Sequence, residues 1–245
     1  MIFLISIWSL AFYADRELRR DIRDLLGRQQ FSAVFLLATE INEDLSTRVR
    51  ALEQVASEFN AVMDARRSEA LKALLHEQVV LNLFNGGAFF TNLDAQVVAS
   101  VPIEYKSQEL QQSEFKEVQD AIVEGKTMIG MPIMDKSLGT PVVRIATPIR
   151  DDAGRVHGAL VGVINLAAPN FLDKFQKNQY AESGAYLLVD ARNRIIVTSS
   201  DKPRQLEVLP PQGVNETMDR YIQGYEGVEV FTNPKGVEVM AAVSH

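Results

Sequence analysis

The feature that most constrains the fold is a long stretch with a helical period near the start of the chain. Between Asp15 and about Asn60 the sequence has no proline and one glycine, Gly27. Mostly apolar residues recur at spacings of three and four, which places them on one face of a helix. They are Val34, Ala38, Ile41, Leu45, Arg48, Leu52, Val55, Phe59 and Val62. Such a stripe is too long for one small domain to cover. The helix therefore lies along two stacked domains, pairs with a second copy of itself, or packs in cis alone.

An apolar run precedes this helix. Residues 1–14 are apolar except for Ser6 and Ser9. Because a bilayer-spanning helix needs about 20 apolar residues, three interpretations stay open: part of a transmembrane helix, the core of a signal peptide, and a buried helix of a soluble core. The abrupt change to a charged segment favours a partial transmembrane helix, which would attach the chain to a membrane. By the positive-inside rule, the arginines after the run favour a cytoplasmic position for the rest of the chain and argue against a position outside the cell membrane. Long domains, however, cross the membrane largely regardless of such charges.

The rest of the chain contains two similar α/β segments. We expect the long helix and a second helix over residues 15–83, followed by units over 84–168 and 169–245. Each unit has a glycine, an aromatic strand, an aspartate turn, a β-branched strand and a serine end, in that order. The second unit has fewer strands, so we expect it to be truncated at its C-terminus. The predicted fold class is α/β (α+β), with the long N-terminal helix along two tandem units of antiparallel sheet.

Composition excludes several classes of protein. The chain of 245 residues has no cysteine, so thiolate metal sites and cysteine nucleophiles are excluded. A net charge of −7 disfavours nucleic acid as a partner. The three histidines are far apart without metal-ligand spacing, and no nucleophile elbow, phosphate loop or HExxH motif is present. We therefore expect no catalytic residues, no metal and no cofactor in this region, which we interpret as a non-enzymatic module.

One stretch resembles a known family. Residues 139–151 read GTPVVRIATPIRD, and residues 158–166 read GALVGVINL after a turn at Gly154. This pattern is similar to double Cache sensor domains, whose two units are PAS-like. The resemblance implies a periplasmic or extracellular sensing region anchored in the bacterial inner membrane, as part of a chemoreceptor, a histidine kinase, or a diguanylate cyclase or phosphodiesterase. It also implies a small-molecule pocket in the membrane-distal unit, 84–168, and signalling by a shift of the long helix. We expect a homodimer through that helix.

The chain departs from the amino-acid-binding branch of that family. That branch has an arginine and a tryptophan in its pocket helix and an aspartate in the final strand that holds the ligand's ammonium group. Here Tyr105 begins a similar stretch, but Lys106-Ser107-Gln108-Glu109 follows without the arginine or the tryptophan, and Val163 occupies the aspartate position. Because an ammonium group would then lack a counter-charge, we expect the ligand not to be a free amino acid.

Arg144 is the strongest candidate for the pocket. It interrupts an apolar strand, so it needs a carboxylate partner or an anionic ligand unless it faces solvent. A pocket arginine would favour an anionic metabolite. Other candidates are equally compatible with the core or with turn chemistry. The full set of candidate ligand-binding residues is Arg144, Tyr105, Phe115, Met131, Ile133 and Asp135. The alternative hypothesis is a protein-interaction or spacer module that binds no small molecule.

Overall fold

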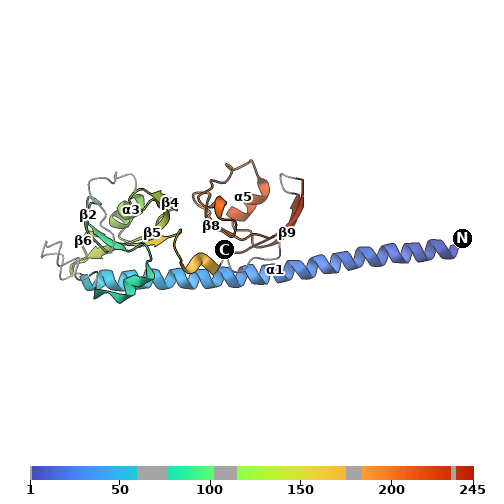
Figure 1. Ribbon diagram of the computed structural model, residues 1–245, viewed down its shortest axis with the longest axis horizontal. Helices are drawn as coiled ribbons and strands as arrows, with labels where there is room; N and C mark the ends of the chain where they lie inside the picture. The colour runs from blue at the N-terminus through green and yellow to red at the C-terminus, as the bar shows by residue number, and fades with distance from the viewer. Residues whose placement is uncertain (1, 60–74, 76, 102–114, 175–183, 233–235) are drawn as a thin grey trace. The chain divides into compact units, whose positions relative to one another are not determined.

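The structure, a computed structural model, describes residues 2–59, 75, 77–101, 115–174, 184–232 and 236–245 (Figure 1). The chain divides into two compact units, which are described separately below. One consists of residues 41–211, and the other combines residues 1–40 with residues 212–245. The mixed α/β composition, the long N-terminal helix and the antiparallel sheets confirm the predicted fold class. The predicted unit boundaries at residues 84, 168 and 169 stay predictions.

The long helix α1 extends over Ile2–Glu58. Its uninterrupted course follows from the absence of proline and from a single glycine in its sequence. Within the unit of residues 41–211, the predicted stripe is buried at Leu52, Val55 and Phe59. The Phe59 ring meets the Phe90 ring edge-on, with 4.6 Å between centroids. This part of the stripe therefore packs in cis against the sheet. No helix in the described part of the chain has both the length and the apolar character needed to cross a membrane.

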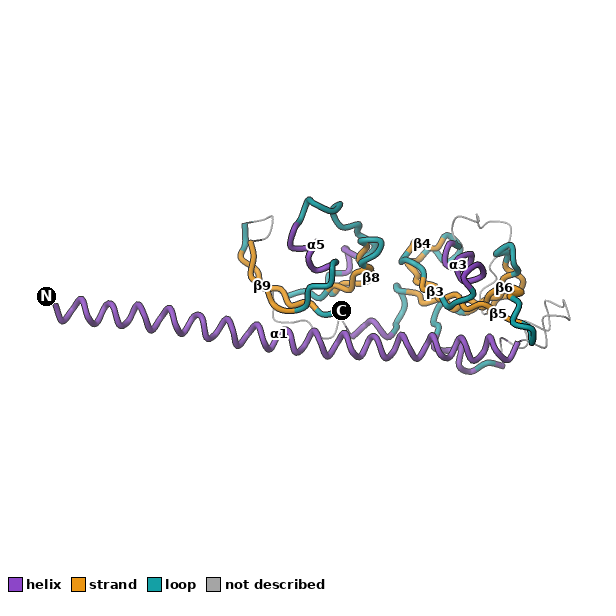
Figure 2. The backbone as a smooth tube through the Cα atoms, turned by 180° about the vertical axis from the view of Figure 1, so that it is seen from behind, coloured by secondary structure: helices purple, strands orange, loops and turns teal. Residues whose placement is uncertain are grey.

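The same unit contains a six-stranded antiparallel sheet in the order β2-β1-β6-β5-β3, with β4 also paired to β5. The strands are β1 Ala88–Thr91, β2 Val97–Val101, β3 Met128–Ile129, β4 Ile133–Asp135, β5 Thr140–Arg150 and β6 Val156–Asn165. The helix α3, Lys116–Glu124, covers one face of this sheet, and α1 lies along the other (Figure 2). α3 ends at Gly125, whose φ of 64° is the left-handed conformation that glycine adopts at helix ends.

Several short elements complete this unit. The second predicted helix falls mostly outside the described residues. Its described end is a 3-10 helix, η3 Val79–Leu83, and not an α-helix. After β6 come the 3-10 turn η5 Phe171–Asp173, the paired strands β7 Leu187–Asp190 and β8 Ile195–Ser199, and the 3-10 turn η6 Lys202–Arg204. The β7–β8 pair corresponds to the predicted aspartate-turn hairpin, because Asp190 accepts hydrogen bonds from the backbone of Arg192 and Asn193 in the turn.

The other unit joins the N-terminal part of α1 to the C-terminal elements. These are α5 Glu216–Ile222 and the antiparallel strands β9 Gly227–Thr232 and β10 Glu238–Val243. Asn215 caps α5 by accepting a hydrogen bond from the Met218 backbone. A Cβ at Gly27 would lie 3.1 Å from Cγ1 of Val228, so the helix and β9 approach closely at that point. The single glycine of the helix therefore marks its contact with this sheet.

Candidate ligand-binding site

The candidate site is built around Arg144, in the middle of β5. Its side chain is 2% exposed, and its backbone is in register with Val163 of β6. Because side chains alternate between the faces of a strand, Arg144 shares a face with Val142 and Ala146. Those two residues belong to the apolar core that Val118 and other α3 residues complete. The arginine is therefore held in the layer between the sheet and α3, where an isolated charge would be costly.

Two carboxylates surround the guanidinium group of Arg144. Nη2 donates to Oδ2 of Asp135 at 2.6 Å, and Nη1 donates to Oε1 of Glu117 at 3.3 Å. The ring of Phe115 lies beneath it, with 4.6 Å between the guanidinium carbon and the ring centroid. Of the alternatives left open by the sequence, the structure therefore shows Arg144 paired with nearby acids.

Asp135 is fixed from both sides at the end of β4. Its second oxygen, Oδ1, accepts hydrogen bonds from the backbone nitrogens of Ser137 and Leu138 at 2.9 and 3.0 Å. Its side chain is fully buried. The Asp135 carboxylate thus both stabilises the turn before β5 and binds Arg144. Its capacity to accept hydrogen bonds is therefore largely used inside the protein.

Glu117 was not among the residues selected from the sequence. It lies in the first turn of α3, and its side chain is mostly buried. Burial raises the pKa of its carboxyl group, while Arg144 acts in the opposite direction. Gly130 makes room for it, since a Cβ there would lie 3.0 Å from the Glu117 side chain. A signal was available: Glu117 precedes Ala121 by four residues, which places it on the apolar face of α3.

The described residues of this cluster contain more acidic groups than basic ones. Among the residues that the structure describes, Asp135 and Glu117 supply two carboxylates, whereas Arg144 supplies one positive charge. The cluster therefore has one negative charge in excess when all three groups are ionised. A buried carboxylate with spare acceptor capacity favours a cationic hydrogen-bond donor, such as an ammonium group. Glu117 has more of that capacity than Asp135, because Asp135 accepts hydrogen bonds on both oxygens, whereas the bond from Arg144 to Glu117 reaches Oε1.

The other predicted site residues do not all lie in this cluster. Phe115 is buried in the cluster and also meets the Phe89 ring edge-on at 5.7 Å. Ile133 is partly buried and packs against the same apolar core. Met131 is 48% exposed and lies at the surface. Tyr105 lies outside the described residues, as do the positions after it in the predicted pocket helix. The structure thus brings together Arg144, Asp135, Phe115 and, at the edge of the core, Ile133.

A family model for the Cache domain matches residues 14–245 of the chain, which therefore belongs to the Cache domain family. Solved structures of low sequence identity share its fold. The ligand-binding domain of the Pseudomonas aeruginosa PAO1 amino acid chemoreceptor PctC, in complex with GABA, is 19% identical with a TM-score of 0.60, over 86% of this chain and 88% of that chain. The ligand-binding domain of Mlp24 with asparagine is 17% identical with a TM-score of 0.66, over 91% and 87%.

A third relative in structure is the extracellular domain assigned to the histidine kinase mmHK1S-Z2. It is 13% identical with a TM-score of 0.64, over 88% of this chain and 90% of that chain. No curated protein sequence matches the chain. Family membership confirms the resemblance to double Cache domains and the predicted role as a sensing domain. Cache domains are extracytoplasmic parts of membrane receptors.

The comparisons also correct one prediction. The expectation that free amino acids are excluded as ligands is wrong, because domains of this fold hold GABA and asparagine. In the amino-acid-binding branch of the family, the expected carboxylate lies at one position of the final strand, where this chain has Val163. Glu117 of α3 lies beside Arg144, which is the register partner of Val163.

Proposed function

We propose that this chain is the periplasmic sensing region of a bacterial inner-membrane receptor and that it binds a small metabolite with an ammonium group, such as a free amino acid. Membership of the Cache family and the amino acids held by domains of the same fold support this proposal. Binding without turnover fits a sequence that lacks recognisable nucleophile, phosphate-binding and zinc-protease motifs. The apolar residues 1–14 are consistent with attachment to the membrane.

The observation that carries the proposal is the second carboxylate, that of Glu117, next to Arg144. In the amino-acid-binding branch of the family, the ammonium-binding aspartate occupies the position of Val163. Here Glu117 supplies a carboxylate from α3, close to the register partner of that position. An ammonium group bound to Glu117 would neutralise the cluster and would replace the hydration that the carboxylate loses on burial.

The same geometry suggests how binding could be transmitted. α3 packs on one face of the sheet, while Leu52, Val55 and Phe59 of α1 are buried on its other side. A ligand that draws α3 and Glu117 toward the sheet would shift the packing of the strands against α1. A two-state change of this kind needs only a few kcal/mol of difference in ligand affinity between the states. We infer that α1 is the element that carries the signal.

Pairs of ligands that differ in the ammonium group test this function. We expect GABA or asparagine to raise the melting temperature of the chain, because a ligand that binds the folded state stabilises it. Butanoate and succinamate, which lack the amine but keep the rest of each molecule, should leave the melting temperature unchanged. Equal shifts from both members of a pair would contradict recognition of the ammonium group. No shift from any member of an amine panel would favour the protein-interaction or spacer module.

A further inference from the structure

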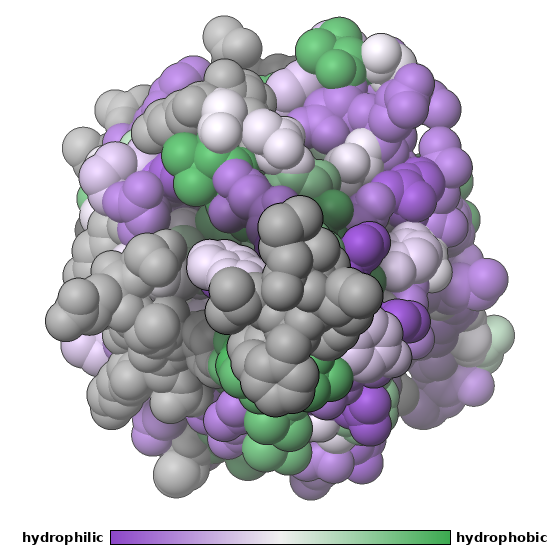
Figure 3. Space-filling view, turned by 90° about the vertical axis from the view of Figure 1, so that its right-hand side faces the viewer, coloured by the Kyte–Doolittle hydropathy of each residue, from purple (hydrophilic) through white to green (hydrophobic). Residues whose placement is uncertain are grey.

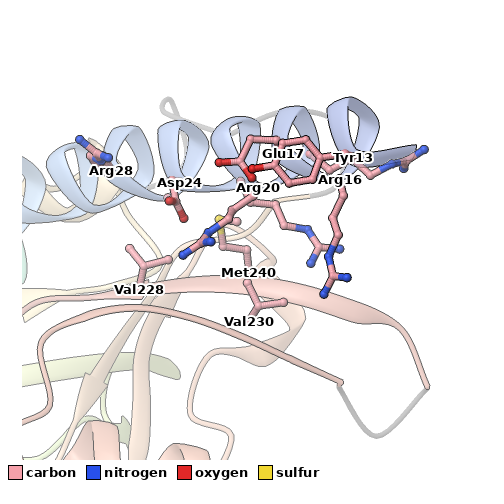
Figure 4. A pocket seen from close by; sticks show the side chains of 12 residues that line it. Tyr13, Arg16, Glu17, Arg20, Asp24, Arg28, Val228, Val230 and Met240 are labelled. Atoms are coloured by element: carbon pink, nitrogen blue, oxygen red, sulfur yellow. The ribbon is translucent and has the colours of Figure 1, made fainter. Parts of the chain in front are cut away.

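A second candidate site lies in the unit formed by residues 1–40 and 212–245. A groove of about 1130 Å³ runs between the N-terminal part of α1 and the β9–β10 pair. On the helix side it is lined by five arginines, Arg16, Arg19, Arg20, Arg23 and Arg28, against two acids, Glu17 and Asp24. On the sheet side it is lined by Val228, Val230 and Met240 (Figure 4). One wall is therefore rich in guanidinium groups and the other is apolar.

Two of these arginines are already neutralised. Arg19 pairs with Asp15 at 2.8 Å, and Arg23 pairs with Glu238 at 2.8 Å. Neither Arg16 nor Arg20 forms an ion pair with any residue that the structure describes. Their side chains extend from α1 toward the sheet (Figure 4). In a chain with a net charge of −7, two unpaired arginines one helical turn apart at the same groove favour an anionic ligand.

The surroundings of this pair indicate an amphiphile. Trp8, Leu10, Phe12 and Tyr13 are all exposed on α1, within the eight residues before Arg16. On the side shown in Figure 3, most of the described surface is hydrophilic and hydrophobic residues form separate small groups. At about 1.5 Å per residue, Arg16 lies roughly 5 Å and Arg20 roughly 11 Å along the helix from Tyr13, whereas one headgroup layer of a bilayer is roughly 5–8 Å thick. If Trp8 to Tyr13 contact the acyl chains, Arg16 would therefore be at headgroup depth, and the long side chain of Arg20 would reach it.

The acids at the groove narrow the choice of headgroup. Glu17 lies between Arg16 and Arg20 in the sequence and also lines the groove. A carboxylate repels a bare phosphate, but it accepts hydrogen bonds from hydroxyl groups. A headgroup with both a phosphate and free hydroxyls satisfies the two kinds of side chain together. We propose that this groove binds the glycerol-phosphate headgroup of an anionic phospholipid, with the phosphate on Arg16 and Arg20 and the hydroxyls on Glu17.

Vesicle flotation with the full chain tests this site. Vesicles of phosphatidylcholine alone are compared with vesicles that also contain phosphatidylglycerol. We expect the full chain to prefer the phosphatidylglycerol vesicles, and the double variant Arg16→Gln/Arg20→Gln to lose roughly 20-fold of its affinity for them. The apolar residues 1–14 are the same in both proteins, so this difference reports on the arginines alone. Binding of the double variant to phosphatidylcholine vesicles should stay unchanged.

A matched double variant controls for the loss of two charges. Arg50 and Arg192 are exposed and lie outside the groove. Arg50→Gln/Arg192→Gln should keep the preference for phosphatidylglycerol. Equal losses in the two double variants, or no preference for phosphatidylglycerol in the full chain, would overturn the proposal. Free glycerol 3-phosphate could also bind to the groove in a saturable way. If that binding were lost in Arg16→Gln/Arg20→Gln to the same extent as vesicle binding, the proposal that the headgroup comes from a lipid would be overturned. Vesicle flotation involves no amino acid ligand. A negative result in this experiment would therefore leave the proposed binding of an ammonium-containing metabolite untouched.

Discussion

Arg144 shows how a single charged residue can be accommodated inside a sheet. Its guanidinium group has Asp135 and Glu117 on two of its nitrogens and the Phe115 ring below it. Each contact offsets part of the cost of removing the charge from water. Asp135 is itself held by two backbone amides of the next turn. The Arg144–Asp135 pair therefore holds the turn between β4 and β5 in place and also compensates the buried charge of Arg144.

Removal of the guanidinium group should be strongly destabilising. Arg144→Met keeps a similar length of apolar chain but leaves Asp135 and Glu117 buried without a counter-charge. We expect a loss of about 3–5 kcal/mol in the free energy of unfolding, measured by urea denaturation. Arg155→Met is the matched control, because Arg155 also pairs with an aspartate, Asp151, but at the surface. The account of the site would be wrong if the two variants lost similar amounts of stability.

Among the elements, β6 depends on glycines for its packing. A Cβ at Gly162 would lie 2.4 Å from the Phe84 ring, and a Cβ at Gly158 would lie 2.0 Å from the Thr91 carbonyl oxygen. Gly162 alternates with Val161 and Val163, which face the α3 side. It therefore points to the opposite side of the sheet, where Phe84 packs directly on the strand. The glycine at position 162 thus allows close packing on the face of the sheet opposite the candidate site.

A comparison of two glycine substitutions separates packing from backbone strain. Gly162→Ala should destabilise the fold by about 1–3 kcal/mol, because Phe84 must move. Gly139→Ala is the control: its φ of 64° disfavours alanine, but nothing lies within 4 Å of a Cβ there. We expect a loss of about 1 kcal/mol from this left-handed strain alone. Thermal and urea unfolding measure both, and a larger loss for Gly139→Ala would contradict the packing role of Gly162.

The elements differ in how well local sequence predicts them. β5 and β6 can be predicted from the sequence, because β-branched residues and the Asp-x-x-Gly turn at residues 151–154 act within a few positions. The site was predicted only in part. The apolar surroundings of Arg144 identify it from its own strand, whereas Glu117 is 27 residues away and meets it through tertiary packing. The 3-10 form of Val79–Leu83 was missed because an apolar run with helical spacing does not distinguish the two kinds of helix.

At the scale of the whole molecule, the two units hold different chemistry. The unit of residues 41–211 contains a buried cluster in which two carboxylates face one guanidinium group. The unit of residues 1–40 and 212–245 contains a groove lined mainly by arginines. The opposite signs suit opposite ligands, an ammonium group in the first and a phosphate in the second. A net charge of −7 for the whole chain conceals this division, so composition alone predicts neither site.

The central claim is that Glu117 holds the ammonium group of the ligand, and calorimetric titration of GABA into the full chain and into Glu117→Gln tests it most directly. We expect the amide to weaken binding by roughly 10- to 150-fold, as the loss of a charge-assisted hydrogen bond does. Glu124→Gln, at the exposed end of the same helix, should bind like the unchanged chain, and all three proteins should unfold at similar temperatures. Unchanged affinity of Glu117→Gln for GABA would contradict the account.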